Sequence, residues 1–422
     1  MTTEDDIYRT STQYRLWSFT PESLASLRSS TNELAAEHVR EAIKRARESH
    51  DTTAQAASPA NGIDGEPIIG QDQENGDGSK EEIECLAVEE EQKLVGFYCQ
   101  KCLELADAIP QPHGPLPTHV KATAVQYLKR FYLSNSPMTY HPKSLMPSAL
   151  FLATKTENHY ISLSKFSSFV RNSTPDTIIA PEFLLTQSLR FTFSVHHPFH
   201  GLEGGFMELT ALANGDGFGL PNELESEKAE IQSQMLNLPI VGGGFKKRPR
   251  QTVTEVKTSV KTGCDRARET LKTSSVLGDA YFLFTPAQIW LAALAIHDKP
   301  LADFYLDAKL QVVSSSSSPA IQKTREALKT KLLRTLNKCT SLLQSYTGPV
   351  ARGSPQMEEL RNIDKKLYKC TNPEKKDIVS LNRAVKREKV DGVGREEKEA
   401  KRRRTEKEKD DLFGPSLTVQ TK

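Results

Sequence analysis

Residues 142–157 read PKSLMPSALFLATKTE, and from Leu145 to Ala153 almost every side chain is apolar or small. An α-helix that is apolar around most of its circumference is buried on most sides. This segment therefore predicts a helix at the centre of a helical bundle, starting at Pro142. Pro147 should kink this helix or move its start, because a proline in mid-helix removes a hydrogen bond and clashes with the preceding turn.

A similar segment follows Thr285 and Pro286, which form an N-cap threonine and a proline at the first helical position. When Pro286 is aligned with Pro142, apolar residues coincide at five positions: Leu145 with Ile289, Met146 with Trp290, Ala149 with Ala293, Leu150 with Leu294 and Leu152 with Ile296. Alignment of Pro286 with Pro147 also matches apolar residues, so either register indicates a duplicated helical unit.

Helical periodicity continues on both sides of the first of these segments. Apolar residues spaced three and four apart predict a helix that ends at Ile109 and another that follows Pro117, with Lys129 away from its apolar face. Shorter helices are expected at 162–170 and 181–193. The first unit should therefore contain five helices.

Changes in composition divide the chain into five parts. Segments rich in Gly, Asn, Asp and Ser with few large apolar residues cannot offset their ordering entropy. We predict an N-terminal extension with an amphipathic helix (1–47), a disordered linker (48–80), a first helical unit (81–195), a second helical unit (196–347) with an inserted loop at 208–265, and a charged tail that is disordered or a lone helix (348–422).

Bulk composition excludes several classes of protein. A formal net charge of +2 over 422 residues is too small for a chain that binds nucleic acid through its overall charge. No apolar stretch approaches the roughly 20 residues that span a bilayer, and residues 1–6 do not resemble a signal peptide. We expect a soluble intracellular protein with reduced cysteines.

Catalytic, metal and cofactor motifs are weak. Cys99 and Cys102 form a Cys-x-x-Cys pair without a second pair at a usable spacing, which favours helix packing over a metal site. Adjacent His196 and His197 are interpreted as loop residues at the junction of the units, because neighbouring side chains of an extended segment point apart. We therefore predict no metal, no cofactor and no catalytic residue.

Several segments together resemble the cyclin family. They are AVQYLKRFYL (124–133), YHP (140–142), FLATKTE (151–157), EFLLTQSLRFTFSVHHPF (182–199) and DAYFLFTPAQI (279–289). The resemblance covers residues 8–47 and 81–347 and implies an all-α fold of two tandem five-helix cyclin boxes. The segment STQYRLWSFTPE (11–22) is similar to the lead-in of the cyclin H subfamily, in a fungal-like form with insertions.

Lys129 separates this chain from the cell-cycle cyclins, which place an aspartate there and pair it with an arginine on the first helix. The resemblance is therefore to the transcriptional branch, in which Lys-Arg-Phe-Tyr is common. It implies that the chain lacks that ion pair.

The resemblance implies a kinase-binding surface around Lys155 and Glu182, whose family counterparts hydrogen-bond backbone groups of a kinase. Purely structural placement also explains these charges, because a lysine near a helix C-terminus and a glutamate in a first turn both suit the helix dipole. The complete predicted kinase-binding set is Lys155, Glu182, Leu152, Thr156 and Phe151, with core packing as the alternative for Phe151.

The function that the resemblance implies is allosteric activation of a cyclin-dependent kinase. The implied partners are that kinase, an assembly factor and the core of transcription factor IIH, with substrates in RNA polymerase II and other kinases. The alternatives are a cyclin of a Mediator or elongation kinase, or a cyclin-fold general transcription factor that contacts DNA. Nuclear localisation is expected, with basic runs at 246–250 and at Lys401, Arg402, Arg403 and Arg404 as candidate import signals.

Overall fold

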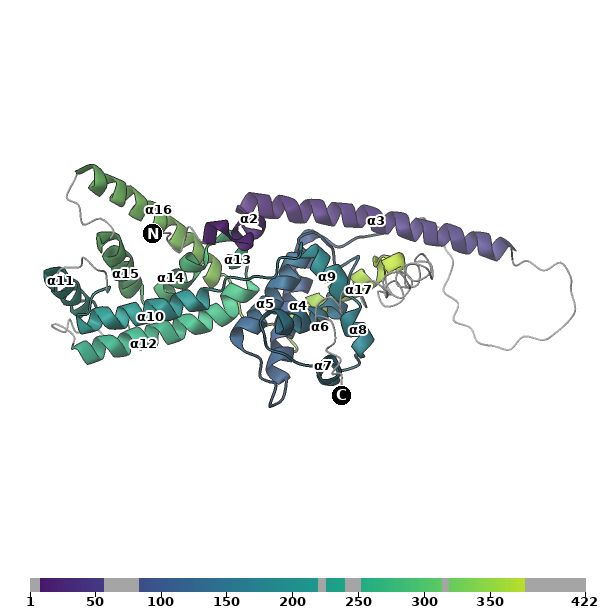
Figure 1. The fold of residues 1–422 in the computed structure, drawn as a ribbon. Coiled ribbons are helices and arrows are strands. Elements are labelled where there is room, and N and C mark those ends of the chain that lie inside the picture. The colour runs from purple at the N-terminus through teal and green to yellow at the C-terminus, as the bar shows by residue number, and fades with distance from the viewer. Residues whose placement is uncertain (1–7, 57–82, 219–224, 240–251, 313–318, 376–422) are drawn as a thin grey trace, which may run out of the picture.

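The computed structural model describes residues 8–56, 83–218, 225–239, 252–312 and 319–375, and within these ranges the chain is helical and contains no strand. Two groups of helices lie side by side and give an elongated body (Figure 1). Their buried apolar side chains form one continuous core. The all-α prediction is confirmed for the described residues.

The first repeat contains six helices, five of them arranged around a central one. They are α4 (Val88–Ala108), α5 (Thr118–Phe131), α6 (Pro142–Thr156), α7 (Leu163–Phe169), α8 (Pro175–Ile179) and α9 (Glu182–Ser188). As predicted, α6 is the central helix, and it packs against α4, α5, α8 and α9. The additional short helix α8 begins at a Thr-Pro pair that the sequence analysis did not single out.

Helix α6 begins where Pro142 predicts. His141 is its N-cap residue, with a ring nitrogen that accepts the backbone N–H of Lys143, and Pro142 occupies the first helical position. The helix continues through Pro147 to Thr156, so Pro147 does not move its start. One helix therefore connects the loop after α5 to the residues of the predicted kinase-binding surface.

Helix α5 differs from the prediction because it is buried on nearly all sides. Lys129 was expected to lie away from the apolar face, but it is 8% exposed, and the adjacent Arg130 is 2% exposed. The N-terminal segment and the second repeat cover the sides of α5 that would otherwise face solvent. Burial of these charges therefore depends on contacts with distant parts of the sequence.

The second repeat is built around α14, the counterpart of α6. Its elements are α10 (Pro198–Asn214), α11 (Glu225–Leu236), α12 (Val253–Thr270), a π-helical turn η1 (Leu271–Ser275), α13 (Ala280–Leu283), α14 (Pro286–His297), α15 (Lys299–Val312) and α16 (Pro319–Gln344). Thr285 caps α14 through the backbone N–H of Gln288. Trp290 of α14 packs so closely on α10 that Gly201 and Gly205 leave no room there for a side chain.

The interpretation of residues 208–265 as an inserted loop is wrong for most of that segment. The end of α10, the whole of α11 and most of α12 lie within it. Val256, Val260 and Cys264 of α12 are buried in the core at helical spacing. The glycine-rich composition of this segment favoured a loop, although α12 contributes buried residues to the core of the second repeat.

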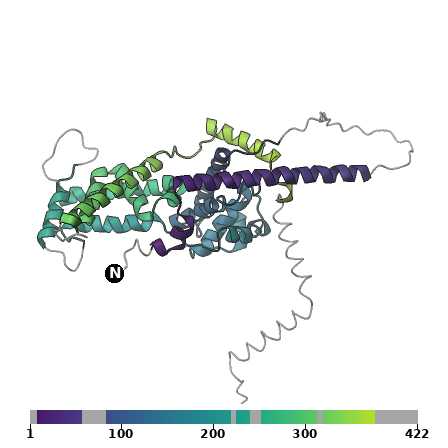
Figure 2. The same ribbon diagram turned by 90° about the horizontal axis from the view of Figure 1, so that it is seen from above.

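The N-terminal extension crosses the junction of the repeats and then follows the first repeat. After α2 (Thr12–Trp17), helix α3 (Pro21–Ala56) runs along the first repeat and extends beyond it (Figure 2). It continues past residue 47, where the predicted linker was to begin. Trp17 donates its indole N–H to Thr192 at 3.0 Å and stacks on Arg130, which anchors α2 on the first repeat.

The charged C-terminal tail contains a packed helix, which corrects the prediction of a disordered tail or lone helix. Helix α17 (Pro355–Lys369) lies against α4, and a short 3-10 turn η2 (Pro373–Lys375) contacts α3. The apolar face of α17 is buried and consists of Leu360, Ile363 and Leu367. The chain therefore returns from the second repeat to close the far side of the first.

Candidate functional site

Lys155 and Glu182 meet on the surface of the first repeat. Lys155 lies in the last turn of α6 and Glu182 at the first position of α9, and the lysine ammonium donates to Glu182 Oε1. Their side chains are 34% and 20% exposed. The second carboxylate oxygen of Glu182 has no hydrogen-bond partner among the described residues. The pair is thus partly exposed to solvent, whereas the unpartnered oxygen of Glu182 is buried.

Two residues that precede Lys155 on α6 are buried next to the pair. Phe151 is 5% exposed, and the Lys155 ammonium lies 4.6 Å from the centre of its ring. Leu152 is 4% exposed, so it adds no exposed apolar area beside the pair. Both side chains belong to the core of the isolated chain, which agrees with the structural alternative considered for Phe151.

Thr156 is half-buried and tied to α5. Its hydroxyl lies 2.9 Å from the hydroxyl of Tyr127, and that tyrosine donates its proton to the carbonyl oxygen of Phe193 at 2.7 Å. These bonds hold the end of α6 against the chain that leaves α9. The structure therefore gives Thr156 a packing role within the chain.

Two aromatic residues, one in α9 and one just after it, are exposed, and the sequence analysis did not select them. Phe183, next to Glu182, is 56% exposed, and Phe191 is 62% exposed. Phe191 also has a φ of 55°, which is unusual for a bulky residue. The helical pattern contained a signal for Phe183, because buried Leu185 and Leu189 of the same segment lie on the opposite face.

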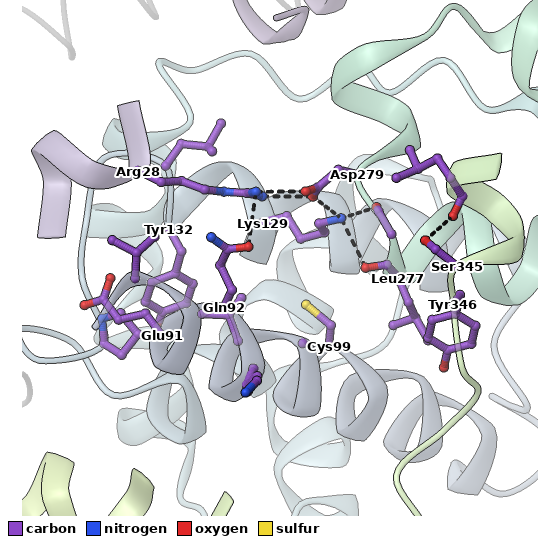
Figure 3. Close-up of a pocket in the computed structure, with 18 residues that line it drawn as sticks. Arg28, Glu91, Gln92, Cys99, Lys129, Tyr132, Leu277, Asp279, Ser345 and Tyr346 are labelled. Carbon is purple, nitrogen blue, oxygen red and sulfur yellow. Dashed lines mark hydrogen bonds and ion pairs between the residues drawn. The ribbon is translucent and has the colours of Figure 1, made fainter. Parts of the chain in front are cut away.

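A second cluster of charges lies at the junction of the repeats, and Figure 3 shows it beside a cavity of about 530 Å³. Asp279, just before α13, accepts two hydrogen bonds from Arg28 of α3, both 2.8 Å long. Lys129 of α5 lies 3.2 Å from the same carboxylate and also donates to the carbonyl oxygens of Leu277 and Gly278. Three separate segments of the chain therefore meet at one carboxylate.

The two cations of this cluster determine the ionisation of Asp279. Burial opposes ionisation of Asp279, but Lys129 and Arg28 outweigh it and hold the carboxyl pKa well below its usual range. The Asp–Arg ion pair of the cell-cycle cyclins was predicted to be absent, and the lysine at that position instead takes part in a different ion-pair network. Its acid comes from the second repeat, which sequence spacing could not reveal.

The cavity at the junction lies against α4, which carries two buried cysteines. Cys99 lines it, and burial raises the pKa of that thiol to about 12, so the thiol stays protonated. Cys102 is buried in the same helix. Among the described residues, no three His, Cys, Asp or Glu side chains lie together as a metal site would require.

Some predicted features lie outside the described residues. These are the candidate import signals at 246–250 and at Lys401, Arg402, Arg403 and Arg404. Of the helices that the structure describes, none combines the length and apolar character that crossing a membrane requires.

Comparison with known proteins identifies both repeats. Residues 115–194 match the family described as "Cyclin, N-terminal domain", and residues 197–344 match "Cyclin C-terminal domain". The boundary between these matches coincides with the loop before α10.

Relatives and solved structures agree with these matches. Cyclin CCL1 of Saccharomyces cerevisiae is 31% identical over 72% of this chain and 62% of its own length, so the chain spans less than two thirds of that relative. Cyclin-H1-1 of Arabidopsis thaliana is 25% identical over 86% of this chain and 88% of that protein.

A solved structure of the CAK complex from Chaetomium thermophilum bound to ATP-gamma-S contains a chain that is 30% identical to this one. The match covers 92% of this chain and 96% of that chain, with a TM-score of 0.60. The chain therefore belongs to the cyclin family, and it is similar to CCL1 and to cyclins of the H type.

Proposed function

We propose that this chain is a regulatory cyclin subunit that binds and activates a cyclin-dependent kinase of the transcription factor IIH type, and that it catalyses no reaction itself. One observation carries the proposal. A chain of the Chaetomium CAK complex matches this one over nearly its whole length at 30% identity. The resemblance of the first cyclin box to transcriptional cyclins supports the same partner.

The mechanism is a population shift in the kinase. An active kinase needs its regulatory αC helix placed so that the glutamate of that helix pairs with the active-site lysine. A rigid helical platform that contacts only this arrangement increases its population. The continuous core of the two repeats makes such a platform, because a densely packed interior deforms little.

The kinase-binding surface in this proposal centres on Lys155 and Glu182. Charged groups form stronger hydrogen bonds to backbone atoms than neutral groups do. The unpartnered oxygen of Glu182 is buried in the isolated chain, and a change of side-chain rotamer brings it out to accept a backbone N–H of the kinase. The more exposed Lys155 can donate to a carbonyl. The exposed ring of Phe183 adds apolar area beside them.

An assembly factor and the core of transcription factor IIH complete the proposed assembly, and its proposed location is the nucleus. CCL1 and the CAK complex chain are the relatives that support this context.

Reconstitution tests the proposal directly. The full chain is mixed with a transcription factor IIH-type kinase, and phosphorylation of an RNA polymerase II C-terminal repeat peptide is followed. We expect a stable complex with activity well above that of the kinase alone. Failure to form a complex, or a complex without increased activity, would contradict the proposal.

A further inference from the structure

Four side chains form a line of hydrogen bonds from the second repeat to the end of α6. The hydroxyl of Tyr281 on α13 lies 3.0 Å from Nδ1 of His197, the residue that precedes α10. Nε2 of His197 lies 2.8 Å from the hydroxyl of Thr123 on α5. Thr123 donates to Oε1 of Glu157 at 2.7 Å. Glu157 is the C-cap residue of α6 and follows Lys155 by two positions.

The direction of these bonds follows from counting protons. A carboxylate only accepts hydrogen bonds, so the single hydroxyl proton of Thr123 goes to Glu157. The oxygen of Thr123 must then accept from Nε2–H of His197. A neutral imidazole carries one N–H, which leaves Nδ1 as the acceptor for the hydroxyl proton of Tyr281. All three bonds therefore point from the second repeat toward α6.

The interior of the protein favours this single arrangement. Thr123 is 0%, His197 7% and Tyr281 2% exposed, so water cannot readily substitute for a lost partner. Burial lowers the pKa of His197 to about 3, and the charges that contribute further are His119, Arg130, His200 and His196. The ring is therefore neutral at physiological pH.

We propose that His197, as the Nε2–H tautomer, is a positioning residue that links the second repeat through Thr123 to Glu157 and so sets the final turn of α6. That turn carries Lys155 and Thr156, and the inference therefore rests on the proposed kinase-binding role of this surface. The link connects the second repeat directly to a surface that lies entirely on the first.

Paired substitutions at Thr123 test the link in the full chain. Thr123→Val removes the hydroxyl at nearly constant shape, whereas Thr123→Ser retains it as the matched control. We expect Thr123→Val to weaken kinase binding by about three- to tenfold, in the range of couplings carried by packed networks. Thr123→Ser should stay within about twofold of the wild type, and Tyr281→Phe should weaken binding in the same direction as Thr123→Val.

A double-mutant cycle shows whether the effect passes through the proposed surface. In a Lys155→Ala background, Thr123→Val should change kinase affinity by less than about twofold, because the group that the link positions is gone. An undiminished effect in that background would overturn the inference. Equal losses for Thr123→Val and Thr123→Ser would also overturn it.

Nitrogen-15 NMR of histidine-labelled full chain tests the link without the kinase. The His197 signals, identified by their absence in His197→Gln, should show the Nε2–H tautomer at neutral pH, and Thr123→Val should shift them. An Nδ1–H tautomer contradicts the inference, even if Thr123→Val fails to fold. If Lys155→Ala leaves kinase affinity unchanged, the proposed surface is wrong, and the tautomer still decides the hydrogen-bond link.

Discussion

Asp279 is the acidic residue that compensates two buried cations at the junction of the repeats. It is the carboxylate that both Arg28 and Lys129 contact, and the side chains of these two cations are 17% and 7% exposed. A cation buried to this extent is costly unless a carboxylate or several carbonyls compensate it. Lys129 has both, and this explains how the chain accommodates a lysine at a buried position.

Replacing Asp279 by Asn should therefore destabilise the protein. The amide leaves two buried cations without a counter-charge, and we expect a loss of about 3 kcal/mol in the free energy of unfolding. Urea denaturation measures it. Asp303→Asn is the matched control, because Asp303 pairs with Lys299 on the surface and should cost less than about 0.5 kcal/mol. Equal losses in the two variants would refute a central role for Asp279.

His197 should make stability depend on pH. Its pKa of about 3 in the folded state lies below the ordinary value of 6.5. Between these two pH values the histidine is protonated in the unfolded state and neutral in the folded state. The stabilisation is complete above pH 6.5 and is lost as the pH falls. Between pH 7 and pH 5, wild type should lose about 2 kcal/mol more than His197→Gln. Parallel pH curves of the two proteins would contradict a buried neutral histidine.

Individual residues were predictable from sequence only where local chemistry decides their position. The proximity of Lys155 and Glu182 followed from the family resemblance. Lys129 could not be placed correctly, because its burial depends on Arg28 and on the carbonyls of Leu277 and Gly278, which lie far away in the sequence. Helical periodicity identifies one apolar face but not a second segment that covers the opposite face.

Among the helices, α6 and α14 were predictable because an almost wholly apolar sequence has only the interior to occupy. Both begin at a proline in the first helical position, as expected. Helix α12 was missed, although Val256, Val260 and Cys264 repeat every four residues. Its Gly263 is helical because Leu294 and Leu301 pack against that position, a tertiary reason that outweighs the low helix propensity of glycine.

The contact of α10 with α14 gives a paired prediction. A Cβ at Gly205 would lie 2.6 Å from the Trp290 ring, whereas a Cβ at Gly204 would meet nothing within 4 Å. We expect Gly205→Ala to destabilise the protein by about 1–3 kcal/mol through overpacking. Gly204→Ala should stabilise it by about 0.5–1 kcal/mol through helix propensity. Thermal and urea unfolding compare the two, and stabilisation by both would show that the contact is not tight.

At the scale of the molecule, the two ends of the described chain close around the first repeat. Helix α3 lies along it, and α17 returns from the second repeat to pack beside α4 (Figure 2). Lys366 of α17 forms ion pairs with Glu84 and Glu90 near the start of α4. Composition alone could not predict this closure, because α17 is rich in charge and its few apolar residues acquire a partner only in the folded chain.

Substitutions in α17 measure how much this closure contributes. Leu367 is 1% exposed and the adjacent Tyr368 is 77% exposed. Leu367→Ala should cost about 2–5 kcal/mol by leaving a cavity between α17 and the first repeat. Tyr368→Ala should change the free energy of unfolding by less than about 0.5 kcal/mol. A negligible effect of Leu367→Ala would mean that α17 does not stabilise the first repeat.

The central claim is that Lys155 and Glu182 serve a kinase, beyond their pairing with each other. Exchange of the two charges, Lys155→Glu with Glu182→Lys, tests it because the internal ion pair can reform. The corresponding exchange of Lys299 and Asp303, an exposed pair on the second repeat, is the control.

Isothermal titration calorimetry with the kinase is the decisive measurement. The Lys155–Glu182 exchange places both charges against their helix dipoles, so it should cost about 1–2 kcal/mol of stability and leave the chain folded. It should weaken kinase binding by about 10- to 100-fold, the loss expected for a charged hydrogen bond. The Lys299–Asp303 exchange should leave binding unchanged. Wild-type affinity in the Lys155–Glu182 exchange would show that the pair is only structural and would contradict the proposed surface.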